Sequence, residues 1–447
     1  MTSLPARDRS SARQWALVAL VAAAALPSPV LRVLEITNGP HPDLSPLVES
    51  LIFGAAIFAA ATLLTWASEV AETEMSAGLA LAILALIAVL PEYAVDLYFA
   101  IKAPHVAECI TPGFPLDCAE PHPRHLAIAN MTGGNRLLVG LAWPTVFLIF
   151  YWRFRRTEMP VLRSNSLGIL FLAAATLYSF TIPLRGNLSL IDTVIMFSLF
   201  AGYLFMASRA PPEDERVFVG PAAAIAALNK GPRRLITAGI FVYAALVIFA
   251  AAEPFAEGLV DTGTDLGVDQ FILVQWVAPL ASESPEFILA GLLAMRGRHD
   301  ASMTILISSK VNQWTLLIGS LPLAYSISGG TLSPLDFDAR QSEEVFLTAG
   351  QSMLAVAIFL SLTMTWWEAI FLAGLFGTQL FFTDTSVRVG YAALYVVLAT
   401  LVLLRDIPRF PNFLSAARET AFEPHLIHAR DNNGRERAPP TGRGSDL

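Results

Sequence analysis

The sequence predicts an all-α polytopic membrane protein of about twelve transmembrane helices. A repeated motif further predicts two inverted repeats, with broken helices meeting near the midplane. Three observations predict this class. The chain of 447 residues is 55% hydrophobic and only 15% charged, a composition that soluble domains do not have. Apolar runs of transmembrane length recur along it. A Pro-Glu pattern also occurs twice, five helices apart.

Apolar segments alternate with polar loops from the N-terminus onward. The first segment is the weakest, because it is short and carries Pro27 and Pro29. It is interpreted as a helix that is retained rather than as a cleaved signal peptide. The segments are expected at about residues 14–34, 46–68, 76–101, 124–152, 166–183, 188–208, 235–258, 268–295, 300–326, 344–363, 366–382 and 387–404.

The charges of the loops indicate how these helices are oriented. Arginine and lysine gather in the loops at 152–165, 209–234 and 295–300 and at both ends of the chain, whereas the loops at 261–269 and 333–344 are acidic. Basic loops stay on the cytoplasmic side of a membrane. The pattern therefore predicts a multi-pass protein of the plasma (inner) membrane with both termini in the cytoplasm.

The same interpretation divides the chain into successive parts. We expect a cytoplasmic N-terminus with an extra first helix (1–45), a first repeat (46–208), a cytoplasmic loop (209–234), a second repeat (235–382), an extra C-terminal helix (383–407) and a disordered cytoplasmic tail (408–447).

The remaining motifs narrow the class of protein. Cys109 and Cys118 share one polar loop on the predicted outer side, where a disulfide between them is possible; two unpaired thiols are the alternative. No Cys/His metal spacing, nucleophile–base set, phosphate loop or cofactor motif stands out. An enzyme is therefore not indicated, and neither is a nucleic-acid partner.

The repeated pattern is a Pro-Glu pair inside an apolar run. Pro91 and Glu92 follow "LALAILALIAV", and Pro285 and Glu286 follow "FILVQWVAPLA". Five helices separate the two copies, and an odd number of crossings inverts the second copy relative to the first. Proline kinks are common in membrane helices, but two matched Pro-Glu pairs are hard to obtain by accident.

Each Pro-Glu pair is followed by an apolar helix with a cluster of small and polar residues. These clusters are "ANMTGGNR" (129–136) and "ISSKVNQ" (307–313). Carbonyls freed at the prolines, together with a carboxylate beside each proline, supply the oxygen ligands that a hard cation prefers. The pattern thus predicts a cation site near the midplane.

At these residues the sequence resembles the calcium/cation antiporter superfamily, which includes the sodium/calcium exchangers. The repeats of that superfamily carry Gly-Thr/Ser-Ser-x-Pro-Glu and then Gly-Asn-x-x-Gly-Ser-Asn. The second repeat here keeps Ser282 and the Pro-Glu pair, whereas the first keeps only its Pro-Glu pair. The helices that follow keep Asn130, Gly133, Asn135 and Ser309, while Lys310 replaces an asparagine.

The resemblance implies a ten-helix core of two inverted five-helix repeats, with the first and last helices as additions. It also implies a secondary active antiporter that exchanges a divalent cation, usually calcium, for sodium or protons by alternating access. It implies Glu92 and Glu286 as the metal-coordinating carboxylates. Inorganic cations and the lipid bilayer would be the partners, and no resident cofactor is implied. The residues expected to line the ion path or to couple it to protons are Asp96, Asn130, Asn135, Ser282, Glu283, Ser309 and Gln313.

Two acids in this set depart from the superfamily pattern. Glu283 lies one turn before Glu286, and Asp96 lies one turn after Glu92. Either extra acid is a candidate proton carrier. The alternative for Asp96 is a solvated residue at the outer end of its helix.

Two basic residues, Arg136 and Lys310, also depart from the pattern and are expected to compensate charge. Buried charges pair or lose their charge. Lys310 is expected to pair with Glu283 or Glu286, and Arg136 with Asp96 or Glu92.

The lysine bears directly on what the site can bind. At ~4 Å and an effective dielectric near 20, a lysine repels another unit positive charge by about 4 kcal/mol. A fixed ammonium can therefore take the place of a bound cation. The alternative function is a transport-inactive or regulatory membrane protein whose acids are permanently neutralised. A transporter of another substrate, with the basic residues on an anion, is a third and weaker reading.

Overall fold

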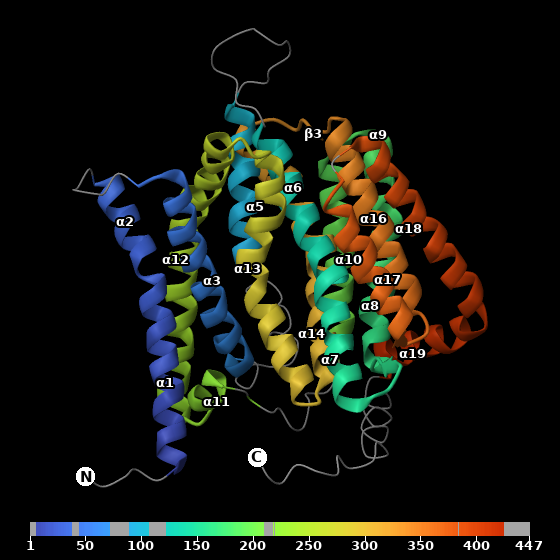
Figure 1. Cartoon of the computed structure of the whole chain (residues 1–447), viewed down its shortest axis with the longest axis horizontal. Coiled ribbons are helices and arrows are strands. Elements are labelled where there is room, and N and C mark those ends of the chain that lie inside the picture. The colour runs from blue at the N-terminus through green and yellow to red at the C-terminus, as the bar shows by residue number, and fades with distance from the viewer. Residues whose placement is uncertain are drawn as a thin grey trace.

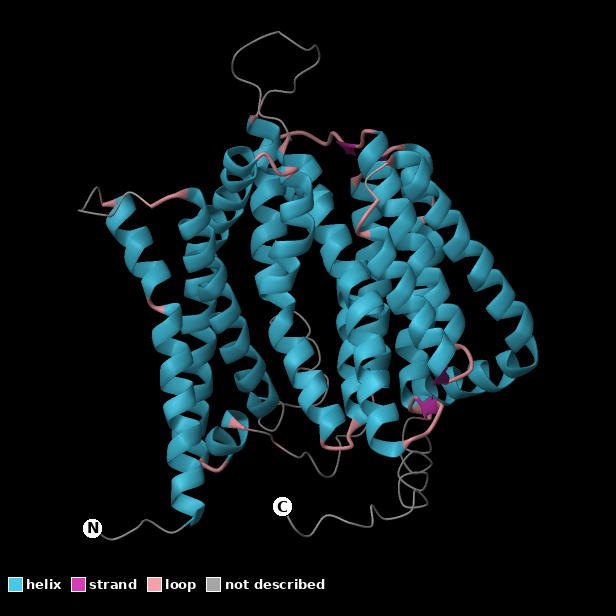
Figure 2. Ribbon diagram, viewed as in Figure 1, coloured by secondary structure: helices cyan, strands magenta, loops and turns pink. Residues whose placement is uncertain are grey.

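The computed structural model describes residues 6–37, 44–71, 89–106, 122–209, 218, 220–382 and 384–423. Helices dominate these residues, and the few strands are short and lie at the ends of the helices (Figure 2). Cys109, Cys118 and the first part of the expected 76–101 segment lie outside the described residues.

The N-terminal helices form one side of the molecule with a long helix from the middle of the chain (Figure 1). They are α1 (Ala6–Ala25), α2 (Pro27–Ile36) and α3 (Pro46–Ala71), and the long helix is α12 (Lys230–Leu266). The expected first helix is therefore divided at Pro27, which has no N–H to continue the α1 ladder. Small residues such as Ala56 and Ala60 let α3 pack closely on α12.

The first half of the chain continues with the Pro-Glu helix and the helices after it. Its elements are α5 (Leu90–Lys102), η1 (Ala103–His105), α6 (Pro123–Leu137), a π-helical turn η2 (Leu138–Ala142), α7 (Trp143–Phe154), β1 (Glu158–Pro160), η3 (Arg163–Asn165), α8 (Ser166–Ser179), α9 (Thr181–Arg185), β2 (Asn187–Leu188), α10 (Leu190–Ala207) and α11 (Pro221–Ala226).

The second half contains corresponding elements. They are α13 (Gln270–Met295), α14 (His299–Asn312), a π-helical turn η4 (Gln313–Leu317), α15 (Ile318–Gly329), β3 (Leu335–Asp336), α16 (Ala339–Phe359), β4 (Thr363–Thr365), α17 (Trp366–Gln379), α18 (Thr385–Asp406), η5 (Ile407–Arg409) and α19 (Phe410–Phe422). Strand β1 pairs antiparallel with β4, and β2 with β3, so each pair joins the two halves.

Many of these helices have the length and composition of membrane spans. Eight stretches of the described chain qualify: Ala12–Ile36, Pro46–Ala71, Pro123–Phe154, Arg163–Arg185, Leu190–Ala207, Lys230–Leu266, Gln270–Met295 and Thr385–Phe422. The segments expected near 300–326, 344–363 and 366–382 are helical as well. The chain is an all-α multi-pass membrane protein, as the sequence predicts.

The two Pro-Glu helices, α5 and α13, run in opposite directions. The end of α5, the start of α6 and the end of α15 meet at one end of the molecule, where Ser328 donates to the Ile101 carbonyl at 2.7 Å and His122 contacts the Val106 carbonyl at 3.0 Å. The start of α13 lies at this end too, because Arg340 at the start of α16 pairs with Asp269 at 2.7 Å. Thus α5 runs toward this end and α13 runs away from it (Figure 1).

The expected break in the second Pro-Glu helix is not found. The helix expected to break at Pro285 does not break, since α13 is continuous through Pro279 and Pro285. Each proline instead removes one helical N–H partner and leaves the carbonyl four residues earlier free, without a break. The irregular backbone lies in η2 and η4, one in each half.

The tail and the middle loop are more ordered than expected. Residues 408–447 are predicted to be disordered, yet 410–422 form α19. Phe413, Ala416, Ala417 and Thr420 recur at helical spacing and are buried, mainly against α8. An apolar face of this kind folds where a partner helix covers it. In the same way α11 and the first turn of α12 occupy part of the loop expected at 209–234.

Candidate functional site

Four acidic side chains are buried where the two halves meet. Glu92 and Asp96 lie one turn apart on α5, and Glu283 and Glu286 lie nearly one turn apart on α13. Asp96 and Glu283 are 0% exposed, Glu92 is 4% exposed and Glu286 is 9% exposed. The alternative of a solvated Asp96 at a helix end is therefore wrong.

The two Pro-Glu carboxylates come from opposite halves, and both are buried. The charge of Glu286 reaches Glu92. The hydroxyl group of Ser282 lies beside Glu92, and that of Ser309 lies beside Glu286. Ser282 also bonds the Ala278 carbonyl at 3.2 Å, one turn earlier in α13. Each carboxylate thus has a hydroxyl neighbour from the second half.

Each of the two additional acids has an amide partner on the neighbouring polar helix. The Asn130 side chain on α6 donates to Asp96 Oδ1 at 2.9 Å. The Gln313 side chain in η4 donates to Glu283 Oε1 at 3.2 Å. A Cβ atom at Gly134 would lie 2.3 Å from that same Glu283 oxygen, so only glycine leaves room for the carboxylate there.

One oxygen of each acid remains without a hydrogen bond to the described chain: Glu92 Oε2, Asp96 Oδ2, Glu283 Oε2 and Glu286 Oε2. Buried carboxylate oxygens are costly unless something compensates them. The described residues contain no group of three or more His, Cys, Asp or Glu side chains arranged as a metal site. A cation bound here would accordingly rest on two carboxylates together with hydroxyl, amide and carbonyl oxygens.

Lys310 is fully buried and does not make the hydrogen-bonded acid pair expected of it. Its ammonium donates to Asn135 Oδ1 at 2.8 Å and to the Asn135 backbone oxygen at 3.1 Å. It also faces the Trp314 ring, 4.5 Å from the ring centre. The charge of Glu283 acts on Lys310, but no salt bridge joins Lys310 to Glu283 or Glu286 in the described structure. The backbone of α6 holds the ammonium instead.

Arg136 points away from the acids of α5, so the expected pair with Asp96 or Glu92 is wrong. Its guanidinium pairs with Glu344 on α16 at 2.5 Å and lies over the Trp276 ring at 4.9 Å. Both Arg136 and Glu344 are 0% exposed. A buried arginine needs a carboxylate partner, and α16 supplies it.

The partner network around Glu344 was not identified from the sequence. Arg388 on α18 pairs with Glu343 at 3.1 Å and also with Glu344. Glu343 and Glu344 were counted with the acidic loop at 333–344, whereas the structure places them inside α16. Arg388 could have indicated this network from the sequence, because a basic residue next to an apolar run needs an acidic partner nearby.

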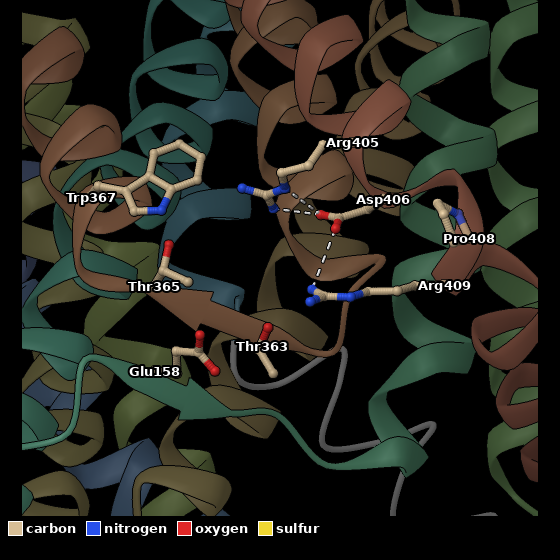
Figure 3. A pocket seen from close by; sticks show the side chains of 8 residues that line it. All are labelled: Glu158, Thr363, Thr365, Trp367, Arg405, Asp406, Pro408 and Arg409. Carbon is tan, nitrogen blue, oxygen red and sulfur yellow. Dashed lines mark hydrogen bonds and ion pairs between the residues drawn. The ribbon is translucent and has the colours of Figure 1, made fainter.

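A pocket of about 310 Å³ is lined by residues of β1, β4, α17, α18 and η5, and none of the four buried acids lines it (Figure 3). Three of its charged side chains are paired: Arg405 bonds Asp406 at 2.5 Å, and Arg409 lies 3.3 Å from Asp406. Arg405 also bonds Glu368 at 2.7 Å. These pairs join the end of α18 to the start of α17, which is a structural role. The candidate functional site is instead the region of the buried acids between α5, α6, α13 and α14.

This arrangement defines a class: a polytopic membrane protein whose two antiparallel halves enclose buried carboxylates. Comparison with known proteins gives the family. The family model described as sodium/calcium exchanger protein matches residues 46–209 and 236–383. The chain belongs to the sodium/calcium exchanger family, within the calcium/cation antiporter superfamily that its motifs resemble.

Solved structures agree with this assignment. The crystal structure of the H+/Ca2+ exchanger CAX is 40% identical, with a TM-score of 0.83, and the match covers 92% of this chain and 99% of that one. Native YfkE is 15% identical, with a TM-score of 0.55 and coverage of 84% and 99%. The sodium-calcium exchanger NCX_Mj is 16% identical, with a TM-score of 0.50 and coverage of 76% and 97%. The last two likenesses concern the fold alone. No curated protein matches the sequence.

Proposed function

We propose that this protein is a secondary antiporter that exchanges calcium for protons across the membrane by alternating access. One observation carries the proposal: Glu92 and Glu286 come from opposite halves and are both buried, and each has an oxygen without a hydrogen bond to the part of the chain that the structure describes. A divalent cation between them would compensate two charges that are otherwise costly in a membrane.

The surroundings of the two glutamates support a hard cation as cargo. Calcium takes six to eight oxygen ligands and tolerates irregular geometry. Ser282 and Ser309 place hydroxyl oxygens beside the two carboxylates. Pro285 leaves the Ala281 carbonyl without its helical N–H partner, which offers a further oxygen on the same helix.

Protons are favoured as the counter-ion by two observations. The 40% identical CAX is described as an H+/Ca2+ exchanger. Each carboxylate can also carry a proton when the calcium ion leaves, so the return of the empty site through the membrane needs no second metal ion. Asp96 and Glu283 are the additional acids that can take part, since each keeps one oxygen free of hydrogen bonds to the described chain.

A transport-inactive protein with neutralised acids is less well supported. That alternative requires Lys310 and Arg136 to hold the acids of the site, and their bonds go to Asn135 and Glu344. Neither basic residue forms an ion pair with Glu92 or Glu286 in the described structure, so both carboxylates can take part in cation binding.

Orientation in the membrane remains a proposal based on charge. Arg153 approaches the turn at Gly297, and β1 of the same basic loop pairs with β4, so the arginine-rich loops gather at one end of the molecule. We infer that this end faces the cytoplasm of a plasma (inner) membrane. A reporter fused to either terminus tests the assignment, and an external signal would overturn it.

The transport test uses purified protein in liposomes that are acidic inside. Radioactive calcium should accumulate when the proton gradient is present and should leave when a protonophore collapses it. Glu92→Gln and Glu286→Gln should each abolish uptake, whereas Glu35→Gln, at a side chain that is half exposed, should not. Undiminished flux in Glu286→Gln would sink the site assignment. Uptake driven by a sodium gradient but not by a proton gradient would overturn the assignment of protons as the counter-ion.

A further inference from the structure

Asn135 and Lys310 occupy equivalent places in the two halves. Asn135 lies three residues before the π-helical turn that begins at Leu138, and Lys310 lies three residues before the turn that begins at Gln313. The two helices run in opposite directions, so these equivalent positions lie next to each other where the helices cross. There the side chain of Lys310 donates two hydrogen bonds to Asn135.

The surroundings of the Lys310 ammonium are those of a bound monovalent cation. Two oxygens of Asn135 accept from Nζ at 2.8 and 3.1 Å. The face of Trp314 lies 4.5 Å away, and an aromatic face attracts cations. The negative charge of Glu283 acts on the same group. Lys310 is 0% exposed, so bulk solvent does not screen these interactions.

We propose that the Lys310 ammonium is a built-in monovalent cation that fills the position between the halves where a second transported cation, such as sodium, would otherwise bind. The inference rests on the proposed function and deepens it. The transporter then carries its divalent ion beside a fixed positive charge and needs no sodium.

The size of the effect follows from charge repulsion. A sodium ion about 4 Å from the ammonium would lose about a thousandfold in affinity at an effective dielectric near 20. Lysine also supplies only donors, so it removes the oxygen ligand that an amide would contribute at this position. If Lys310 served only to join α6 to α14, removal of its charge would leave the ion selectivity of the transporter unchanged.

The experiment compares Lys310→Asn with Lys310→Arg. Asparagine recreates at 310 the residue found at the equivalent position 135, and arginine retains the charge. In liposomes, an outward sodium gradient should accelerate calcium uptake several-fold in Lys310→Asn but not in the wild type or in Lys310→Arg. Lys102→Asn, which removes a lysine that pairs with Glu257 far from this position, is the matched control and should behave as wild type.

A second readout does not depend on transport. Sodium, compared with choline at equal concentration, should raise the melting temperature of Lys310→Asn but not that of the wild type. If no variant moves calcium yet this pattern holds, the proposed function fails and the inference stands. Sodium stabilisation of the wild type, or a folded Lys310→Asn that ignores sodium in both assays, overturns the inference. Should Lys310→Asn not fold, Lys310→Gln and the wild-type sodium titration decide by the same criteria.

Discussion

The ammonium of Lys310 on α14 and the amide oxygen of Asn135 on α6 lie 2.8 Å apart, with both residues fully buried. They belong to opposite halves of the molecule and to equivalent points on helices that run in opposite directions. This bond holds the Lys310 side chain against α6 instead of against the carboxylates of the candidate site. On the proposed assignment, a divalent-cation site and a built-in monovalent cation lie side by side.

Asn135→Ala should weaken calcium binding. The substitution leaves Lys310 with only the backbone oxygen, and the ammonium is then drawn toward Glu283, the nearest opposite charge that acts on it. Loss of one hydrogen bond to a charged group corresponds to roughly a tenfold rise in the KM for calcium. Initial uptake rates over a range of calcium concentrations measure it. The control is Asn187→Ala, whose amide bonds only its own turn, and an unchanged KM in Asn135→Ala refutes the explanation.

Gly134→Ala should impair transport while the protein stays folded. The added Cβ would lie 2.3 Å from Glu283 Oε1, so the carboxylate must turn away from Gln313. The displaced atom is the end of a side chain, which limits the cost in stability, but displacement of a candidate proton carrier can lower the rate by roughly a hundredfold.

Gly374→Ala in α17 is the matched control, because a Cβ there meets nothing within 4 Å. Calcium flux and melting temperature are measured for both variants. Equal flux in the two would show that Glu283 does not need its present position.

Glu344→Gln should destabilise the protein strongly. It leaves the guanidinium of Arg136 buried without its carboxylate, which costs about 3–5 kcal/mol. The double variant Arg136→Met with Glu344→Gln leaves Arg388 paired with Glu343 and should unfold at a higher temperature than Glu344→Gln alone.

Thermal unfolding in detergent, followed by tryptophan fluorescence, tests this rescue. Glu35→Gln breaks an exposed ion pair with Arg32 and should leave the melting temperature nearly unchanged. A double variant no more stable than Glu344→Gln would argue against the pairing.

Phe413→Ala should lower stability by about 3–5 kcal/mol, because Phe413 is 1% exposed in the packing of α19. Phe410→Ala, in the same helix at a side chain that is 45% exposed, is the control. Equal melting temperatures for the two variants would mean that α19 contributes no packing.

The elements of the candidate site could be located from local sequence. Glu92 and Glu286 stand out because a proline and a carboxylate inside an apolar run are costly, and the pair occurs twice at matching places. Asn130, Ser309 and Gln313 could be assigned to the helices that follow for the same local reason. Helices and their polar interruptions depend on neighbours in sequence, so the sequence predicts them well.

The partners of the basic residues could not be found in this way. Lys310 bonds a residue 175 positions away. Arg136 pairs with Glu344 of α16, a residue that the sequence pattern placed in an acidic loop. The nearest acids in the repeat pattern were the obvious candidates for both, and neither is the hydrogen-bonded partner. Pro285 shows the same limit, since α13 is continuous through a residue that was expected to break it.

The sequence by itself determined that the chain is an all-α membrane protein with two matched Pro-Glu segments and acids buried in apolar runs, because composition and spacing act locally. Only the tertiary structure decided which charge faces which. Antiparallel packing of the two halves brings Asn135 to Lys310 and α16 to Arg136, and in a low-dielectric interior each buried charge binds the nearest polar group that this packing supplies.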